Sequence, residues 1–175
     1  MGSALVGAVL RGDFGESVSA LANGMALIVG AAGNDSCGLS SGHARVLAYS
    51  STTSKRNRLR STLVRAASGD EFRNSVSMPA NGMTVAVGAR ENNDNRESSG
   101  HVRLFSHYPT TNKWNQLGSA LAGAASGDEF GTSVLTSADG MSVVAGAPCN
   151  RGNGENSGHV RILRLKDIIL NKEHG

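Results

Sequence analysis

The chain repeats itself at a constant interval of 58 residues, as Gly24, Gly82 and Gly140 show. Three landmarks occur once in each of the first, second and third copies: Asn23-Gly24-Met25, Asn81-Gly82-Met83 and Asp139-Gly140-Met141; Gly42-His43, Gly100-His101 and Gly158-His159; Ser17-Val18, Ser75-Val76 and Ser133-Val134. Repeats of this length are typical of units that each bury one face against the next, so periodicity constrains the fold before any local propensity does.

Within one copy, the pattern predicts short strands separated by turns. The expected strands of the third copy cover residues 134–136, 142–146 and 159–163, and a fourth strand is clearest in the middle copy at 113–118. The dipeptide Asp139-Gly140 predicts a tight hairpin in which both central residues have positive φ. The nearly continuous apolar segment 142–146 predicts burial on both faces. In the strand expected at 159–163, the alternation of apolar and polar residues places Val160 and Ile162 on one face.

Four antiparallel strands per repeat predict an all-β fold: three consecutive four-stranded antiparallel blades of a β-propeller, forming a partial ring. The alternatives, a β-trefoil or a β-prism, rank lower because trefoil repeats are usually shorter. We expect one repeat domain over residues 1–175, with blade 1 at about 12–65, blade 2 at about 70–123, blade 3 at about 128–165 and a tail at 166–175. A high glycine count of 23 beside only 3 prolines fits many tight turns.

The motifs of the third copy resemble the FG-GAP repeat, which builds the amino-terminal propeller of integrin α subunits. The resemblance rests on Gly127–Val134, Ala138-Asp139-Gly140, Gly146-Ala147-Pro148 and Gly158-His159-Val160-Arg161. The first copy keeps Phe14-Gly15, whereas the middle copy departs with Phe72-Arg73. The resemblance implies a propeller that presents loops to a protein or glycan ligand, in an adhesion-related role at the cell surface or outside the cell.

Three blades are fewer than the four to eight of a closed propeller. In register, Ser3-Ala4-Leu5 matches Ser119-Ala120-Leu121, so the sequence starts within a fourth strand, and it ends after a third strand. We expect either a fragment whose own further blades complete the ring, which we favour, or a second copy that does so.

Strands that run up and down a blade place the 2–3 loops and the 4–1 connections on one face of the ring. This face collects most of the carboxylates and many Asn and Gly residues, and it is expected to be acidic, with a basic opposite face. Loops on a rigid scaffold commonly carry binding residues. The candidate binding residues are Asn34, Asp35, Asp70, Glu71, Asn92, Asn93, Asp94, Asp128, Glu129, Asn150 and Asn153.

Several residues recur once per copy and are interpreted as structural. They are Gly24, Gly82, Gly140, Phe14, Phe72, Phe130, His43, His101, His159, Arg45, Arg103 and Arg161. A threefold histidine set could bind a metal or act in acid–base chemistry. Residues that each blade repeats are more often needed for folding, and we interpret the His/Arg pairs as bonding a neighbouring turn or blade.

No cofactor and no metal are predicted. Ca²⁺ is possible in blades of this kind, but the 1–2 connection is a bare hairpin around Asn23-Gly24, too short to supply six to eight oxygen ligands. The basic stretch Lys55–Arg60 is interpreted as an outermost strand whose charges block edge pairing, and not as a nucleic-acid site.

The sequence carries no Gly-x-Ser-x-Gly elbow and no Cys/His metal spacing. We therefore expect a non-catalytic binding or scaffold module, and the alternative is a fragment of a propeller-bearing extracellular hydrolase or lyase. A formal charge of +3 does not favour a nucleic-acid partner, and no apolar run is long enough for a membrane span. The ligand, the compartment and the full number of blades are not determined by these residues.

Overall fold

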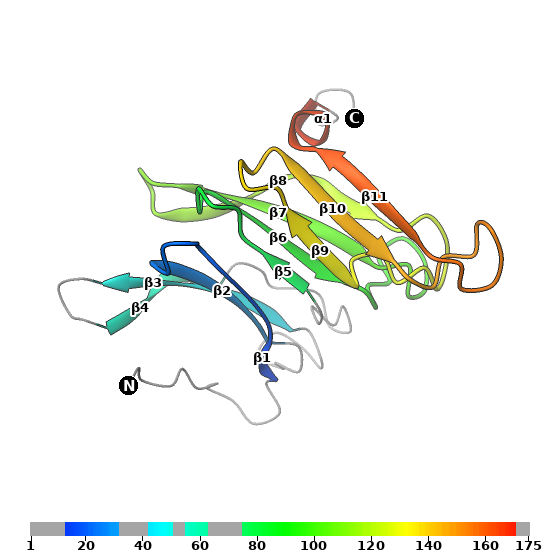
Figure 1. The fold of residues 1–175 in the computed structure, drawn as a ribbon, viewed down its shortest axis with the longest axis horizontal. Coiled ribbons are helices and arrows are strands. Elements are labelled where there is room, and N and C mark those ends of the chain that lie inside the picture. Colours follow the sequence, from blue (N-terminus) through cyan, green and yellow to red (C-terminus); the bar gives the residue numbers. More distant parts are fainter. Residues whose placement is uncertain (1–12, 32–41, 51–54, 63–74, 171–175) are drawn as a thin grey trace.

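A computed structural model describes residues 13–31, 42–50, 55–62 and 75–170 of the chain (Figure 1). The elements of the first copy are β1 (Phe14–Ala20), β2 (Ala26–Ala31), β3 (His43–Ser50) and β4 (Lys55–Thr62). Those of the second are β5 (Ser75–Ser77), β6 (Thr84–Ala89), β7 (His101–Tyr108) and β8 (Lys113–Ala122). Those of the third are β9 (Ser133–Thr136), β10 (Ser142–Ala147), β11 (His159–Arg164) and the helix α1 (Leu165–Leu170).

Each copy forms its own antiparallel sheet, and the strands lie in chain order across it. The orders are β1-β2-β3-β4, β5-β6-β7-β8 and β9-β10-β11, which we call blades 1, 2 and 3. The first strands lie next to one another, since β1 contacts β5 and β5 contacts β9. This arrangement is a series of propeller blades, as the repeat predicted, and differs from a β-trefoil or a β-prism. Blade 3 has three strands in the described residues, and the helix α1 covers the beginning of the segment expected to be the tail.

The second strands are the most apolar of their blades. The burial expected for residues 142–146 is found for Val143, Ala145 and Gly146 of β10, whereas Ser142 and Val144 are half-buried. In the equivalent strand β6, which has a blade on either side, all five residues from Val85 to Ala89 are buried. The outermost strand β4 carries the basic stretch from Lys55 onward, in agreement with its interpretation as an edge strand.

The 1–2 hairpin differs from the expected turn. Of its central residues only the glycine has positive φ, with Gly140 at 74°, whereas Asp139 does not. Gly140 N donates to Ser137 O at 2.9 Å, and Asp139 Oδ1 accepts from Met141 N at 2.9 Å. The side-chain oxygen bonds the amide two residues ahead, which holds Asp139 in the ordinary backbone region. The other two blades repeat both bonds, at residues 21–25 and 79–83.

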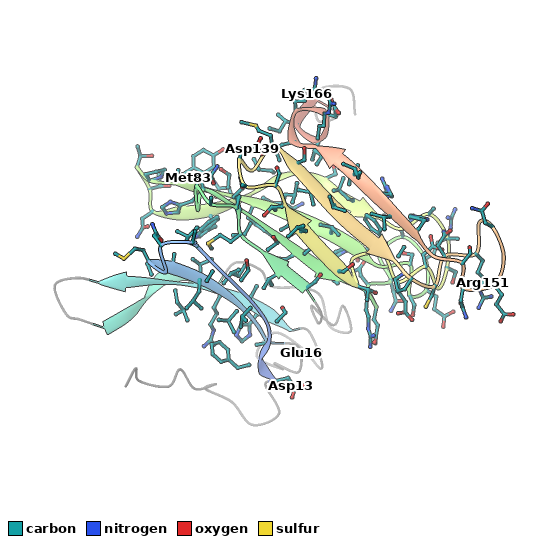
Figure 2. All side chains as sticks on the ribbon, viewed as in Figure 1. Asp13, Glu16, Met83, Asp139, Arg151 and Lys166 are labelled. Carbon is teal, nitrogen blue, oxygen red and sulfur yellow. The ribbon has the colours of Figure 1, made fainter. Side chains whose placement is uncertain are left out.

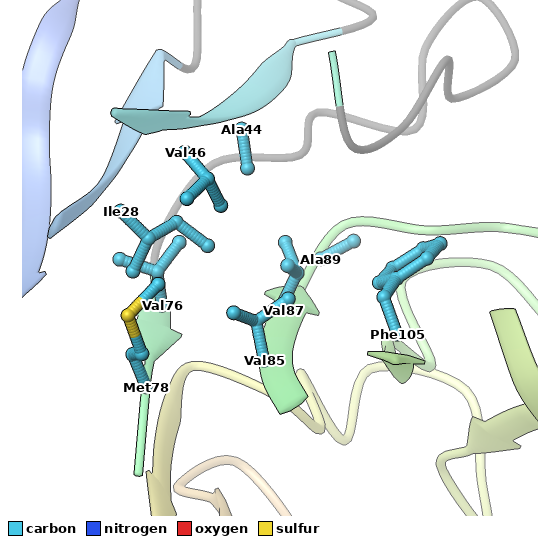
Figure 3. Close-up of a cluster of buried hydrophobic side chains, with 9 residues drawn as sticks. All are labelled: Ile28, Ala44, Val46, Val76, Met78, Val85, Val87, Ala89 and Phe105. Atoms are coloured by element: carbon cyan, nitrogen blue, oxygen red, sulfur yellow. The ribbon is translucent and has the colours of Figure 1, made fainter. Parts of the chain in front are cut away.

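Neighbouring blades are joined by apolar side chains from facing sheets. Between blades 1 and 2 the buried cluster comprises Ile28, Ala44, Val46, Val76, Met78, Val85, Val87, Ala89 and Phe105 (Figure 3). Between blades 2 and 3 it comprises Ala86, Val102, Leu104, Phe130, Val143, Ala145, Ala147 and Ile168. Full burial of a Val, Leu, Ile or Phe side chain contributes about 1.5–3 kcal/mol, so these clusters are the main stabilising contacts between blades.

In blades 1 and 2, a serine of the first strand adds a polar contact to the next blade. Ser19 Oγ accepts a hydrogen bond from Met78 N at 3.1 Å. One blade further, Ser77 Oγ accepts from Thr136 N at 2.9 Å. The recurrence of the bond 58 residues later shows that adjacent blades meet in one fixed register.

Candidate binding face

The 2–3 loop of blade 2 lies against the connection from blade 2 to blade 3. Main-chain hydrogen bonds join the two segments, residues 97–100 and 123–130, along their length. Their donor and acceptor pairs are Gly127 N to Glu97 O (2.9 Å), Glu129 N to Ser98 O (3.1 Å), Phe130 N to Ser99 O (3.0 Å) and Gly123 N to Gly100 O (2.9 Å). The 2–3 loops and the 4–1 connections therefore share one face, as the strand order predicted. We call this surface the loop face.

Asp128 fixes the connection from within. It is 1% exposed, and its Oδ2 accepts from Ala124 N at 3.0 Å and from Ala125 N at 2.8 Å. Its Oδ1 accepts from Asn150 Nδ2 at 3.0 Å, which links the connection to the 2–3 loop of blade 3. With both carboxylate oxygens engaged by protein donors, this buried candidate residue orders the loop face from below.

Asn92 and Asn150 occupy the same position in consecutive blades. Each carbonyl accepts from the glycine that ends its loop, Gly100 N at 3.2 Å and Gly158 N at 2.9 Å. Asn92 is 1% exposed, and its Oδ1 accepts from Asp94 N at 3.1 Å. Both asparagines thus hold the base of a loop.

The exposed tips carry the groups that a partner could reach. Of the candidate residues, Asn93, Asp94 and Asn153 are exposed, while Glu129 is half-buried. Further exposed polar residues lie on the same loops outside the candidate set, among them Asn95, Glu97, Arg151 and Glu155. Figure 2 shows Arg151 at the loop face and Met83 and Asp139 at the opposite rim. Asn95, Glu97, Arg151 and Glu155 share a position in the 2–3 loops, and this shared position is the signal that could have identified them in the sequence.

The loop face carries both signs of charge, and in its described part the expected acidic surface is a mixed one. Arg90 Nη2 lies 2.9 Å from Glu91 Oε1, and Arg103 Nη2 lies 3.2 Å from Asp94 Oδ2. Arg96 donates to the carbonyl of Ala124. A partner with neutral or mixed polar groups fits such a surface better than a polycation does.

The remaining candidates, Asn34, Asp35, Asp70 and Glu71, lie outside the described residues, as does Phe72.

The repeated histidines lie at the start of each third strand. His43 is 5% exposed and His101 is 1% exposed. Burial, followed by the charge of Arg103, lowers the pKa of His101 to about 4, against an opposing effect of Asp94. His101 is therefore neutral at neutral pH.

Two of the repeated arginines, Arg45 and Arg161, lie over repeated phenylalanines. The guanidinium carbon of Arg161 is 4.8 Å from the ring centroid of Phe130, and that of Arg45 is 6.0 Å from the ring of Phe14. Arg161 Nη1 also donates to Ala122 O of blade 2 at 2.8 Å. Stacking on an aromatic face together with a carbonyl bond is a use of arginine that lysine does not reproduce.

Within the described ranges, no group of three or more His, Cys, Asp and Glu side chains is placed to hold a metal ion. In the same ranges, no helix has the length and apolar character of a membrane span. Cys149 is a free thiol on the loop face, and its pKa is raised by partial burial and by the neighbouring Glu129 carboxylate.

Solved structures with a similar fold are β-propellers. Hydrazine synthase of Kuenenia stuttgartiensis matches 96% of this chain with a TM-score of 0.52 and 10% identity, over 37% of its own length. The periplasmic gluconolactonase PpgL of Pseudomonas aeruginosa matches 85% of this chain with a TM-score of 0.53 and 12% identity, over 38% of its own length. The chain thus spans less than two fifths of either protein, and at these identities the likeness concerns the fold alone.

No protein-family model matches the chain, and no curated protein matches its sequence.

Proposed function

We propose that this chain is a non-catalytic binding or scaffold module whose loop face contacts a protein or glycan partner. The observation that carries the proposal is that some residues of the loops form a fixed framework while others remain exposed. Main-chain bonds and the buried Asp128 hold the loops in place, while other side chains at the tips are exposed. A surface that is ordered before binding loses little conformational entropy when a partner arrives.

The blades are proposed to be of the FG-GAP type. Phe130 is fully buried between blades 2 and 3, and Gly131 follows it with φ of 94° at the same junction. This placement gives the Phe-Gly pair of blade 3 a structural role at the junction between blades. The resemblance to the integrin α propeller then extends the proposal to an adhesion-related role outside the cell.

Four exposed tip residues allow the loop face to be tested without disturbing its framework. Glu97, Arg151, Asn153 and Glu155 are exposed, and their side chains make no hydrogen bond to another described residue. Ligands would first be sought on glycan and protein arrays. A ligand found there should bind the variant with all four residues changed to Ala at least ~10-fold more weakly, a loss of about 1.4 kcal/mol.

Lys113→Ala is the matched control, because Lys113 is exposed at the start of β8 on the opposite rim. It should leave the affinity unchanged. A broad panel of hydrolase and lyase substrates, assayed in parallel, tests the alternative. Turnover without any stably bound ligand, or equal losses in the two variants, would overturn the proposal.

A further inference from the structure

Blade 3 inserts a plug into a socket on blade 2. The plug is Phe130-Gly131, and the socket consists of Ser75, Gly88, Gly100 and His101. Ser75 Oγ donates to Gly131 O at 2.7 Å. The approach is so close that a Cβ on Gly88 would lie 2.1 Å from Gly131 O, and a Cβ on Gly131 would lie 2.4 Å from His101 O. Glycine is therefore required on both sides of the contact.

Blade 3 has the same socket on its far side, and there the socket is open. The residues 58 positions after the blade 2 socket are Ser133, Gly146, Gly158 and His159, identical in type at every position. These four residues, with Val160, line a cavity of about 410 Å³. The cavity is thus located at the position that the plug fills one blade earlier.

The apolar residues beside this open socket are exposed, although their counterparts in blade 2 are buried. Val160 is 66% exposed and Ile162 is 74% exposed. The equivalent Val102 and Leu104 of blade 2 are 0% and 3% exposed because blade 3 covers them. Exposed apolar surface of this kind is characteristic of an interface.

Blade 1 carries a plug of the same sequence and backbone conformation. Gly15 has φ of 103°, against 94° for Gly131, and the preceding Asp13 has φ of 41°, against 54° for Glu129. No atom in the described residues lies within 4 Å of a Cβ built on Gly15.

The surface around this plug is open as well. Phe14, Gly15 and Val18 line a cavity of about 360 Å³. Val18 is 66% exposed, whereas its counterpart Val76 in blade 2 is 8% exposed against blade 1.

We infer that the open socket of blade 3 binds the Phe14-Gly15 plug of a second copy of this chain. The second copy's own socket takes the plug of the first, so two chains of three blades close a ring of six. Six blades lie within the range of known propellers, whereas a third copy would give nine. The two junctions are equivalent, as in a symmetric pair whose head-to-tail contacts close on themselves.

One position departs from the internal junction. Leu135 stands where Ser77 accepts the main-chain bond from the next blade. Leu135 is 63% exposed, so the junction between copies has an apolar contact at this point in place of a hydrogen bond.

The first test is the mass of the protein in solution, measured by light scattering and sedimentation. The unmodified chain should have twice the 18.0 kDa of one copy. Val18→Asp on the plug side and Val160→Asp on the socket side should each weaken self-association by at least ~100-fold, because each leaves a carboxylate buried without a partner at both junctions. Both residues are exposed in the single chain, so circular dichroism and thermal melting should show that each variant folds.

Met141→Asp is the control, because Met141 is 62% exposed and its counterpart Met83 stays 39% exposed with a blade on either side. This variant should keep the doubled mass. A monomeric unmodified chain overturns the inference. So does a protein that Val160→Asp dissociates but Val18→Asp does not, since that pattern indicates socket faces packed against each other.

A cross-link tests the register. Ser77 Oγ and Thr136 Oγ1 lie 2.9 Å apart at the internal junction, and their counterparts between copies are Leu135 and Ala20. With Cys37 and Cys149 replaced by Ser, a mixture of Ala20→Cys and Leu135→Cys chains should form a disulfide-linked pair under oxidation, and neither chain alone should do so. Failure of the mixture to cross-link, or efficient linking of Leu135→Cys chains to themselves, contradicts the proposed contact.

Discussion

The middle and third blades differ far more in burial than in sequence. Strand β7 begins His-Val-Arg-Leu and strand β11 begins His-Val-Arg-Ile. In β7 the first, second and fourth of these residues are buried, whereas in β11 the second and fourth are exposed and the first is half-buried. The same residues in the same strand therefore become core or surface according to whether a blade follows. In an array of this kind, burial is a property of the neighbour as much as of the sequence.

The largest effect should come from removing the buried plug. Phe130→Ala deletes a side chain that is 0% exposed and should reduce the free energy of unfolding by about 3–5 kcal/mol. Phe14→Ala, at the half-buried counterpart, should lower the free energy of unfolding by less than half as much. Both changes are to be made in the Val18→Asp background, in which copies do not associate. Urea denaturation measures both. Equal losses would show that the blade 1 plug is already packed within its own chain.

A comparable contrast is expected between Leu104 and Ile162. Leu104→Ala removes a 3% exposed side chain from the blade 2–3 cluster and should cost about 2–4 kcal/mol. Ile162→Ala, at 74% exposure, should change the stability of the single chain by no more than about 0.5 kcal/mol. The same urea experiment in the Val18→Asp background gives both values. A large loss at Ile162 would mean that this face is covered in the single chain.

Lowering the pH should destabilise the buried junction through His101. Its folded-state pKa of about 4 lies below the ordinary histidine value of 6.5, so the native state binds fewer protons than the unfolded state between these values. Stability is thus retained above pH 6.5 and falls progressively toward pH 4, by at most about 3 kcal/mol.

The difference between urea midpoints near pH 7 and near pH 4 measures this effect. It should shrink in His101→Gln relative to the matched change His107→Gln, because His107 lies farther out on the same strand and is more exposed. If both variants kept the full pH dependence, its source would lie elsewhere in the chain.

The smallest loss of stability among the buried positions should be at Asp128, which holds the connection between blades 2 and 3 in place. Asp128→Asn replaces one accepting oxygen by a donor and should cost about 1–3 kcal/mol, since the carboxylate accepts from two main-chain amides and from Asn150. Hydrogen exchange at Ala124 and Ala125 should accelerate in the same variant. Glu97→Gln, at an exposed position nearby, should leave exchange unchanged. Unchanged protection in Asp128→Asn would assign the order of this segment to its main-chain bonds alone.

The arrangement of strands could be predicted because it depends on spacing. Landmarks such as Gly82 and His101 recur at one interval only if every copy pairs its strands in the same way. The turn geometry at Asp139 could not be read in this manner, because a side-chain oxygen competes with the backbone for the amide of Met141, and the dipeptide is compatible with either outcome.

The burial of certain polar residues was the second feature that could not be predicted from the sequence. Asn92 and Asp128 lie in polar, glycine-rich segments, where most side chains face solvent, and their sequence neighbours do not distinguish them. Apart from the Asn150 side chain that bonds Asp128, their partners are main-chain amides, which every residue except proline possesses and which leave no trace in the sequence. The exposure of Ile162 could not be predicted either, because an alternating sequence pattern indicates which residues share a face of a strand but not whether that face is covered.

Four hydrogen bonds between the 2–3 loop of blade 2 and the following connection run from main chain to main chain, and the side chains of Asn95 and Arg96 add bonds to the carbonyls of Gly123 and Ala124. The Glu97 side chain takes no part in these bonds, so any residue that tolerates the local backbone angles can stand at this position without loosening the contact beneath. At Glu97, and likewise at Arg151 and Glu155, the chemical identity of the side chain is independent of the backbone that displays it. A scaffold of this kind can exchange one specificity for another by replacing such surface residues, and new side chains at these three positions should be displayed on an unaltered frame.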